Sequence, residues 1–432
     1  QSRGSLSYRD TNRLAGLSRH RYADASGRRN VLRSAKWGET AVKTRIQNGL
    51  VLRDGKFSSA PLCFANGKIL ADDGTAAGRE IDANGNYVTA GFLDLHVHGG
   101  AGYDFMDGEE EAFEKIAAFH AKHGTTALCP TTLSGAPEEM NRVFEIYRKL
   151  KSRDRAGADF VGLHLEGPYF ALSQSGAQDP KYVHPPVREE YEALLNATED
   201  IVRWSAAPET DRDYAFATAL RKRNILVSAG HTEADCRQML CAAKHGYTHM
   251  THFYSCMKSV ERVHGIRIAG AVEAAYLCDA ITVEVIADGM HLPPELLQLV
   301  YQCKGADKTA LITDAMRGAG LPDGSTTVLG SKTNGQTVSI ARGVAWMPSG
   351  EAFAGSVATT DRLVRTVSKD AGIPLADAVK MASETPARIL GCTHKGTLAV
   401  GMDADIVIFD KQIQMQKVFV RGREVFDRSR SE

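Results

Sequence analysis

The sequence lacks a net charge, because 52 lysines and arginines balance 52 aspartates and glutamates among 432 residues. A neutral chain has no overall electrostatic field with which to hold nucleic acid or an anionic membrane surface. The sequence also has no run of about 18 apolar residues, the length that a membrane-spanning helix needs. We therefore expect a small-molecule ligand, and neither nucleic acid nor a membrane as a partner.

Paired cysteines and nucleotide-binding loops are also absent. The eight cysteines form no C-x-x-C pair, and several lie in apolar or small-residue runs, as Cys129 does in TTALCPTT. This usage favours reduced, mostly buried thiols and hence a cytoplasmic protein. No G-x-G-x-x-G or Walker sequence is present, which argues against a dinucleotide-binding or P-loop fold.

The first 41 residues differ from the rest of the chain. Residues 1–38 hold nine lysines and arginines, six serines and only two acidic residues. An Arg- and Ser-rich start is typical of transit peptides, but this segment has no clear amphipathic stripe. We expect residues 1–41 to be a basic, weakly structured tail outside the fold.

From Val42 to Tyr87, short apolar runs alternate with turn signals. These signals are Asn48-Gly49, Asp54-Gly55, Asn66-Gly67 and Asn84-Gly85. Asn-Gly and Asp-Gly tolerate positive φ, so each predicts a hairpin turn between two strands. Strand-like segments return in GTLAVGMDADIVIFD and MQKVFVRGREVF, near the other end of the sequence. We predict that residues 42–90 and 393–432 pair into one small β-sandwich domain.

Between these segments, residues 91–392 alternate strand-like and helix-like patterns. Apolar runs that end in polar residues occur at 92–98, 125–132, 159–166, 201–209, 225–231, 247–252, 281–291 and 309–315. Amphipathic stretches such as EEEAFEKIAAFHAKHG, with its apolar residues on one helical face, separate several of them. Eight such units predict an α/β fold, a parallel (β/α)8 TIM barrel, better than an open doubly wound sheet.

Polar residues should converge at one end of this barrel, because the C-terminal ends of its strands face the active site. Those ends carry His96, His98, Thr131, Thr132, Glu166, Glu209, His231, His252, His291 and Asp314. His96 and His98 are two apart on one strand, so both rings face the same side of the sheet. With the acids and histidines of the other ends, they offer nitrogen and oxygen ligands without thiolate, which suits zinc or another first-row divalent ion in a catalytic site. The candidate ligands are His96, His98, Glu166, His231, His252 and Asp314.

Three nearby residues have simpler interpretations. His164 alternates with Glu166, and we expect it to support a ligand or to pack rather than to bind metal. His249 falls on the opposite side of its strand from His252, which indicates a structural role. Cys256 has no matching His/Asn arrangement for a nucleophile, so we expect it in the pocket wall.

Several motifs resemble one known family. TAGFLDLHVHGG resembles the first-strand signature of the amidohydrolase superfamily. GLHLEGPYF, SAGHTEA, MTHFYSCM, IADGMH, LITDAMRGAG and FAGSVAT resemble, in order and spacing, the N-acetylglucosamine-6-phosphate deacetylase family. The resemblance extends over about residues 42 to 428 and includes the small β domain. No lysine stands near the position at which related hydrolases carry a carbamylated lysine.

The resemblance implies roles for individual residues. Glu166, His231 and His252 are implied as ligands of the main metal, and Asp314 as the catalytic aspartate. His96 and His98 imply a second ion bridged through Glu166. Zinc is the expected metal, with iron or manganese as alternatives, and a homodimer is the expected assembly. Substrate contacts are implied for Ala177, Gln178, His291, Phe353, Ala354 and Gly355.

The chain departs from the family pattern at two places. Ser255 and Cys256 replace an Asn-Ala pair that contacts the substrate. His264 stands where the family carries an arginine that reaches the phosphate of a substrate in the neighbouring subunit, and Arg262 and Arg267 flank it. The metal chemistry is therefore better supported by these motifs than the phosphosugar specificity.

The resulting hypothesis is metal-dependent hydrolysis of N-acetylglucosamine-6-phosphate to glucosamine-6-phosphate and acetate, in amino-sugar catabolism. Alternatives are the same reaction on N-acetylgalactosamine-6-phosphate, or another amidohydrolase activity such as adenine deaminase or D-aminoacylase. A catalytically silent barrel that acts as a binding partner is the alternative outside enzymes.

Overall fold

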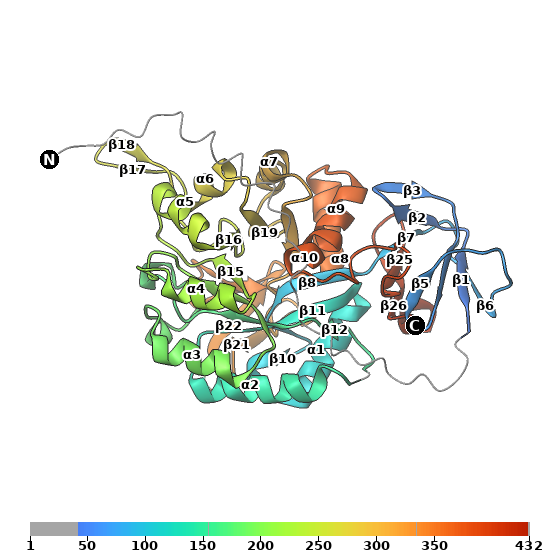
Figure 1. Cartoon of the computed structure of the whole chain (residues 1–432), viewed down its shortest axis with the longest axis horizontal. Helices are drawn as coiled ribbons and strands as arrows, with labels where there is room; N and C mark the ends of the chain where they lie inside the picture. Colours follow the sequence, from blue (N-terminus) through green and yellow to red (C-terminus); the bar gives the residue numbers. More distant parts are fainter. Residues whose placement is uncertain (1–41, 154, 334, 431–432) are drawn as a thin grey trace. The chain divides into compact units, whose positions relative to one another are not determined.

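A computed structural model describes residues 42–153, 155–333 and 335–430 (Figure 1). The basic tail predicted for residues 1–41 lies outside the described residues. Within the described part of the chain, no helix combines the length and the apolar character needed to cross a membrane.

Parallel strands form the centre of the fold, in the order β8-β11-β13-β14-β15-β16-β19-β20. They are β8 (Phe92–Val97), β11 (Thr125–Thr132), β13 (Leu163–Glu166), β14 (Ile201–Ala206), β15 (Leu226–Ala229), β16 (Tyr247–Met250), β19 (Thr282–Ile286) and β20 (Thr309–Ile312), with the short β12 (Asp159–Phe160) beside β11. The ring is brought close to closure where the Asp314 N–H, just after β20, donates to the His96 carbonyl of β8 at 2.9 Å. All eight predicted runs contribute a strand, and the predicted barrel is confirmed.

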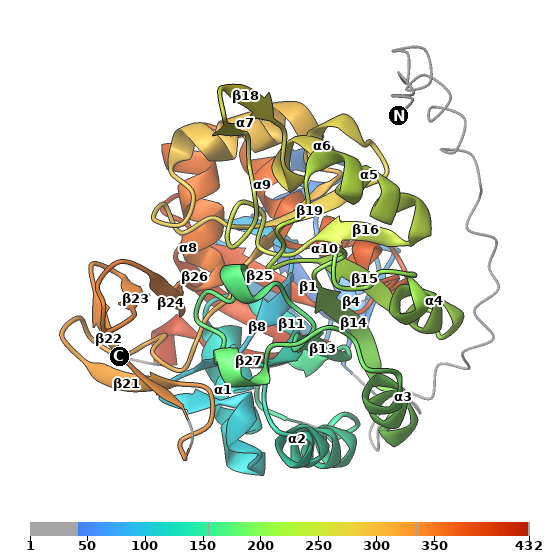
Figure 2. The ribbon, with the colours of Figure 1, turned by 90° about the vertical axis from the view of Figure 1, so that its left-hand side faces the viewer.

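Helices surround these strands (Figure 2). They are α1 (Glu110–Lys122), α2 (Pro137–Leu150), α3 (Arg188–Ala197), α4 (Ala215–Lys222), α5 (Cys236–His245), α6 (Ala271–Leu277), α7 (Pro294–Lys304), α8 (Thr360–Arg365), α9 (Leu375–Ala382) and α10 (Glu384–Ile389). In α1, Phe113, Ile116 and Ala117 are buried on one face, and acidic residues occupy the first turn. Acidic side chains at the start of a helix interact favourably with the helix dipole. The helix α1 therefore forms where the amphipathic pattern predicts it.

Two sheets form a β-sandwich, and one of them combines strands from both ends of the described chain. One has the order β27-β26-β25-β7-β2-β3 and the other β5-β4-β1-β6. Their strands are β1 (Thr44–Gln47), β2 (Leu50–Arg53), β3 (Lys56–Ser58), β4 (Leu62–Ala65), β5 (Lys68–Leu70), β6 (Arg79–Asp82), β7 (Tyr87–Ala90), β25 (Ile406–Phe409), β26 (Met415–Val420) and β27 (Arg423–Asp427). Antiparallel pairing of β7 with β25 joins the two ends (Figure 1). The small β domain predicted from both termini is therefore confirmed as part of the fold.

Two of the four predicted hairpin turns are wrong. Asp54-Gly55 and Asn66-Gly67 do turn the hairpins β2–β3 and β4–β5. Asn48-Gly49 and Asn84-Gly85 instead lead from one sheet of the sandwich to the other, because β1 and β6 pair together while β2 and β7 pair together. These two turns also bind each other, since the Gly85 N–H donates to the Asn48 carbonyl at 2.7 Å. Burial of both sheet faces favours this crossing over a hairpin.

The cysteines are less buried than expected. All eight are free, but only Cys63 and Cys129 are buried, and Cys241 and Cys303 are exposed. The prediction of mostly buried thiols is therefore wrong. Four of the eight lie on helices or at their ends. Of these, Cys236 and Cys278 are half-buried, and Cys241 and Cys303 lie on exposed helix surface.

Smaller strands follow several barrel strands at their carboxyl ends. They are β9 (Gly99–Gly100), β10 (Tyr103–Asp104), β17 (Glu261–Val263), β18 (Ile266–Ile268), β21 (Thr326–Leu329), β22 (Gln336–Ala341), β23 (Val344–Trp346) and β24 (Phe353–Ser356). The last four form one antiparallel sheet inserted between β20 and α8. They place the segment 353–355 beside Asp314, because Ser356 forms a β-bridge with Ala315, the residue that follows Asp314.

Candidate active site

Six polar side chains meet at the carboxyl end of the barrel. His96 lies near the end of β8, His98 directly follows that strand, and Glu166 is the last residue of β13. The other three each lie two residues beyond a strand: His231 after β15, His252 after β16 and Asp314 after β20. All six are buried.

The three residues that follow their strands have left-handed backbone. The φ angles are 49° for His231, 28° for His252 and 47° for Asp314. A non-glycine residue in this region costs on the order of 1–3 kcal/mol and is held there by the surrounding structure. This turn of the backbone directs the side chains toward the barrel axis instead of following the alternation of the strand.

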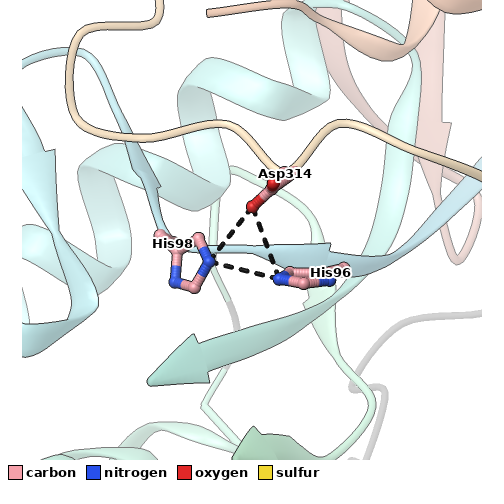
Figure 3. A group of neighbouring side chains, drawn as sticks. All are labelled: His96, His98 and Asp314. Carbon is pink, nitrogen blue, oxygen red and sulfur yellow. Dashed lines mark hydrogen bonds and ion pairs between the residues drawn. The ribbon is translucent and has the colours of Figure 1, made fainter. Parts of the chain in front are cut away.

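The first group of three consists of His96, His98 and Asp314 (Figure 3). The Nε2 atoms of the two histidines are 3.2 Å apart. Asp314 Oδ1 lies 3.1 Å from His98 Nε2 and 3.4 Å from His96 Nε2. Two imidazoles from one strand and a carboxylate from the loop above therefore point at a common centre.

The second group consists of Glu166, His231 and His252. Glu166 Oε1 lies 3.3 Å from His231 Nε2 and 3.0 Å from His252 Nε2, and the two histidine nitrogens are 3.1 Å apart. The other oxygen of Glu166, Oε2, lies 3.4 Å from His98 Nε2. The carboxylate of Glu166 thus faces both groups at once.

The spacing of these atoms fits a divalent metal. With metal to nitrogen distances of about 2.0–2.1 Å, neighbouring ligands of a tetrahedral zinc lie roughly 3.3 Å apart. The observed separations of 3.0 to 3.4 Å within the two groups match that value. The donor set of imidazole and carboxylate also suits zinc, iron or manganese.

The electrostatics of the site attract cations. Burial alone lowers the pKa of His98, but hydrogen bonds to Asp314 and Glu166 and their charges raise it to about 10. The same two carboxylates raise the pKa of His96 to about 9 against the effect of burial. Burial raises the pKa of Glu166, but the surrounding imidazoles outweigh it and hold that pKa well below its usual range. Positive charge is therefore strongly favoured at this centre.

The segment 353–355 lies directly beside Asp314. The Ser356 N–H donates to the Asp314 carbonyl at 2.9 Å. A Cβ on Gly355, whose φ is +76°, would come within 3.2 Å of that carbonyl, so this position favours glycine. The ring of Phe353 lies 4.7 Å from the ring of His291, whose Nδ1 donates to Asp288 at 2.8 Å. The structure thus brings His291, Phe353 and Gly355 to one wall of the site.

Gln178 binds the metal-site carboxylate. Its Nε2 donates to Glu166 Oε2 at 2.7 Å, and its Oε1 accepts from the Ser134 N–H at 2.8 Å. Ala177 accepts from Gln336 Nε2 through its carbonyl at 2.9 Å. The predicted pair Ala177-Gln178 is therefore next to the site.

The residues that replace the family's Asn-Ala pair also lie at the site. The Ser255 N–H donates to the carbonyl of His252 at 2.8 Å. A Cβ on Gly176 would lie 2.5 Å from Cys256 Sγ, so the thiol packs against the loop that carries Ala177. Cys256 therefore forms part of the wall, beside the loop and His231.

The residues expected to bind phosphate lie on an exposed hairpin. β17 and β18 pair around a turn at His264 and Gly265, and Arg262, His264 and Arg267 are all exposed. Within the described part of the chain, none of these three side chains forms a hydrogen bond or an ion pair. The structure does not bring them to the two ligand groups, and the hairpin projects away from α5 and α6 (Figure 1).

Sequence reasoning missed two charged residues beneath the site. Glu284 on β19 accepts from His96 Nδ1 at 2.9 Å, and Arg203 on β14 pairs with Glu284. Both side chains are fully buried. Burial raises the pKa of Glu284. The charge of Arg203 outweighs burial and holds the pKa of Glu284 well below its usual range. A single charge inside an apolar strand, in TVEVI and in IVRWSA, is the signal that could have found them.

The neighbouring histidines support this region. His249 Nε2 lies 3.2 Å from Glu284 Oε2, so this residue faces the barrel interior. His164 Nε2 lies 2.8 Å from Ser205 Oγ, and its ring is 4.6 Å from that of His96. Glu209, predicted at a strand end, accepts from Thr232 and supports the loop after His231.

This chain is similar to known proteins. The sequence pattern of the amidohydrolase family matches residues 87–425. The N-acetylglucosamine-6-phosphate deacetylase of Lysinibacillus sphaericus is 32% identical over 347 residues, 80% of this chain and 87% of that protein. The N-acetylgalactosamine-6-phosphate deacetylase of Escherichia coli O157:H7 is 32% identical over 334 residues, 77% of this chain and 86% of that protein.

A solved structure is also similar to this chain over most of its length. A variant N-acetyl-D-glucosamine-6-phosphate deacetylase from Mycobacterium smegmatis, in complex with N-acetyl-D-glucosamine-6-phosphate, superimposes with a TM-score of 0.80 at 28% identity. The match covers 90% of this chain and 100% of that one.

The barrel and its two ligand groups define a hydrolase built to hold divalent metal at the carboxyl ends of its strands. The match to the family pattern extends over most of the chain. The chain belongs to the amidohydrolase family and, within it, to the N-acetylglucosamine-6-phosphate deacetylase family, so the resemblance of its motifs is confirmed.

Proposed function

We propose that this protein hydrolyses the N-acetyl group of N-acetylglucosamine-6-phosphate to glucosamine-6-phosphate and acetate. The observation that carries the proposal is the convergence of two ligand groups, one of them containing Asp314, in a chain 32% identical to a deacetylase of this kind. An equally identical relative is named for N-acetylgalactosamine-6-phosphate, so that epimer is the second candidate substrate.

The two ligand groups and the side chains of His291 and the 353–355 segment have separate roles in the proposed reaction. A divalent ion held by Glu166, His231 and His252 would polarise the acetyl carbonyl and lower the pKa of water, which is what such ions supply in hydrolases. Asp314 takes the proton from the attacking water and delivers it to the leaving nitrogen. An amine leaves poorly without that proton, so a single shuttling acid/base matches the reaction. His291 and the 353–355 segment orient the acetyl group from the other side.

We assign the His96/His98/Asp314 group a second ion, with zinc as the expected metal at both positions. Replacement of His96 by Gln and His98 by Asn should lower the metal content by about one ion per chain, because two of three ligands are removed. Metal analysis of purified protein measures the ratio. An unchanged ratio would show that the chain binds one ion and that His96 and His98 are not ligands of a second ion.

The exposed hairpin β17–β18 is our candidate for phosphate binding across a homodimer. Arg262 and Arg267 face each other directly in the antiparallel pair. Like charges placed opposite each other are unfavourable, and a bound dianion would turn that repulsion into attraction. His264 at the turn adds a third donor. Because the hairpin projects from its own barrel, a neighbouring copy is the protomer whose substrate it would reach.

Removal of either arginine should therefore raise KM for phosphorylated substrates. A charge-assisted hydrogen bond contributes about 1.5–3 kcal/mol, so Arg262→Ala or Arg267→Ala should raise KM by about tenfold or more. KM for the unphosphorylated sugar should not change. Arg142→Ala, an exposed arginine on α2, is the matched control. Changes below about twofold in Arg262→Ala, His264→Ala and Arg267→Ala together would contradict this assignment.

A substrate screen tests the function itself. Acetate release is measured with N-acetylglucosamine-6-phosphate, N-acetylgalactosamine-6-phosphate and the two unphosphorylated sugars, and ammonia release with adenine. Acetate from the first sugar phosphate at the highest kcat/KM supports the proposal, whereas ammonia release would indicate a deaminase. Metal-free protein without activity after addition of zinc would indicate a silent barrel.

A further inference from the structure

The interior of the barrel beneath the two ligand groups is charged. Barrels of this kind are usually filled by layers of branched apolar side chains. Here Arg203 and Glu284 fill the layer with an ion pair, and both are completely buried. The pair spans the barrel from β14 to β19.

Every donor of Arg203 is used. Its Nε donates to Ser228 Oγ at 3.0 Å, and its two NH groups donate to the Leu95 carbonyl and Thr251 Oγ1, both at 3.1 Å. The same two groups donate to Glu284 at 2.5 and 2.7 Å. The guanidinium is therefore fixed in position by four strands or strand ends, and it presents two parallel donors to one carboxylate.

Glu284 links this cation to both ligand groups. Its Oε1 accepts from His96 Nδ1 at 2.9 Å and from the His252 backbone N–H at 3.0 Å. Its Oε2 lies 3.2 Å from His249 Nε2. With the two bonds from Arg203, the carboxylate accepts five hydrogen bonds. His96 belongs to the first group and His252 to the second, so one side chain contacts both.

We infer that Glu284, held by Arg203, is a positioning residue that sets the metal affinity of both ligand groups. A carboxylate paired with a guanidinium only accepts hydrogen bonds, so His96 must carry its proton on Nδ1. Its Nε2 lone pair is then directed at the centre shared with His98 and Asp314. The bond to the His252 N–H fixes the left-handed turn that directs the second histidine.

Stability alone does not account for the pair. Replacement of a buried ion pair by apolar residues of similar volume is often neutral or stabilising, because desolvation of two charges is costly. An apolar pair would lose the contacts of Arg203 to Ser228, Thr251 and the Leu95 carbonyl. It would also lose the contacts of Glu284 to His96, His249 and His252, two of which are candidate metal ligands. The ion pair is therefore placed where its cost is offset by the orientation of metal-binding groups.

The test is metal affinity, which also makes it independent of the deacetylase activity proposed above. In Glu284→Gln, competition with a chelating dye should show zinc affinity reduced by about 10- to 100-fold, the usual effect of losing a group that orients a ligand. The visible spectrum of the cobalt-loaded protein should shift as His96 loses its fixed orientation. Asp159→Asn is the matched control, because Asp159 is a buried carboxylate paired with the buried Lys395 and contacts no ligand.

A second variant separates positioning from folding. Arg203→Met combined with Glu284→Leu leaves no uncompensated buried charge, but it leaves the polar groups named above without these partners. We therefore expect it to fold with a metal-free Tm below that of the wild type, and zinc affinity is measured at a temperature at which circular dichroism shows it folded. Its zinc affinity should still fall by at least about tenfold. Wild-type affinity in this double variant would overturn the inference. If the wild type itself binds metal but releases no acetate, the proposed function fails while the inference stands.

Discussion

Asp314→Asn should fold, keep the ion of the Glu166 group and lose at least about a hundredfold in kcat. The loss follows because a positioned acid/base contributes roughly 10² to 10⁴ to the rate, and an amide can neither accept the water's proton nor deliver it to the leaving nitrogen. Asp314 is also 3.1 Å from His98 Nε2, so the first ligand group is weakened in the same variant. Steady-state kinetics of acetate release measure the effect, and circular dichroism checks the fold.

Metal analysis is needed beside the kinetics, because it separates loss of the acid/base from loss of metal in the first ligand group. Loss of rate at retained metal in the Glu166 group identifies Asp314 as the proton carrier. Asp211→Asn provides the control, since Asp211 is another buried carboxylate that accepts from the Phe216 and Ala217 N–H groups at the start of α4. Activity within about threefold of the wild type in Asp314→Asn would remove this residue from the mechanism.

The six candidate ligands could be predicted because a barrel places every strand end at one rim. That rule needs only the approximate end of each strand, and so it holds for His231, His252 and Asp314, which lie two residues beyond their strands. Alternation along a strand is less useful there. It predicts His249 on the side opposite to His252, yet His249 contacts Glu284 in the interior, because the backbone turns between the two histidines.

Other features depend on partners that are distant in sequence. Glu284 and Arg203 are 81 residues apart, and each looks like an isolated charge in an apolar strand. The Asn48-Gly49 turn has the same local signal as Asn66-Gly67, but one crosses between sheets and the other closes a hairpin. Both outcomes satisfy the local preference for positive φ. Burial of two sheet faces selects between them, and only the assembled sandwich provides that burial.

Glu166→Gln should reduce metal binding at both groups, unlike any single histidine substitution. The Glu166 carboxylate lies beside histidines of both groups. Its Oε1 is 3.3 Å from His231 Nε2, 3.0 Å from His252 Nε2 and 3.5 Å from His96 Nε2, and its Oε2 is 3.4 Å from His98 Nε2. An amide is a weaker, uncharged ligand, and the loss of the anion also removes the charge that favours cations at this centre.

We therefore expect the metal content of Glu166→Gln to fall by more than the one ion expected for the His96/His98 double variant, and activity to fall with it. Inductively coupled plasma mass spectrometry after dialysis against metal-free buffer compares the two variants. Asp211→Asn is again the control, because Asp211 is a buried carboxylate that accepts from the Phe216 and Ala217 N–H groups at the start of α4. Metal content equal to that of the wild type in Glu166→Gln would show that the carboxylate is not a shared ligand, and the two groups would then bind their ions independently.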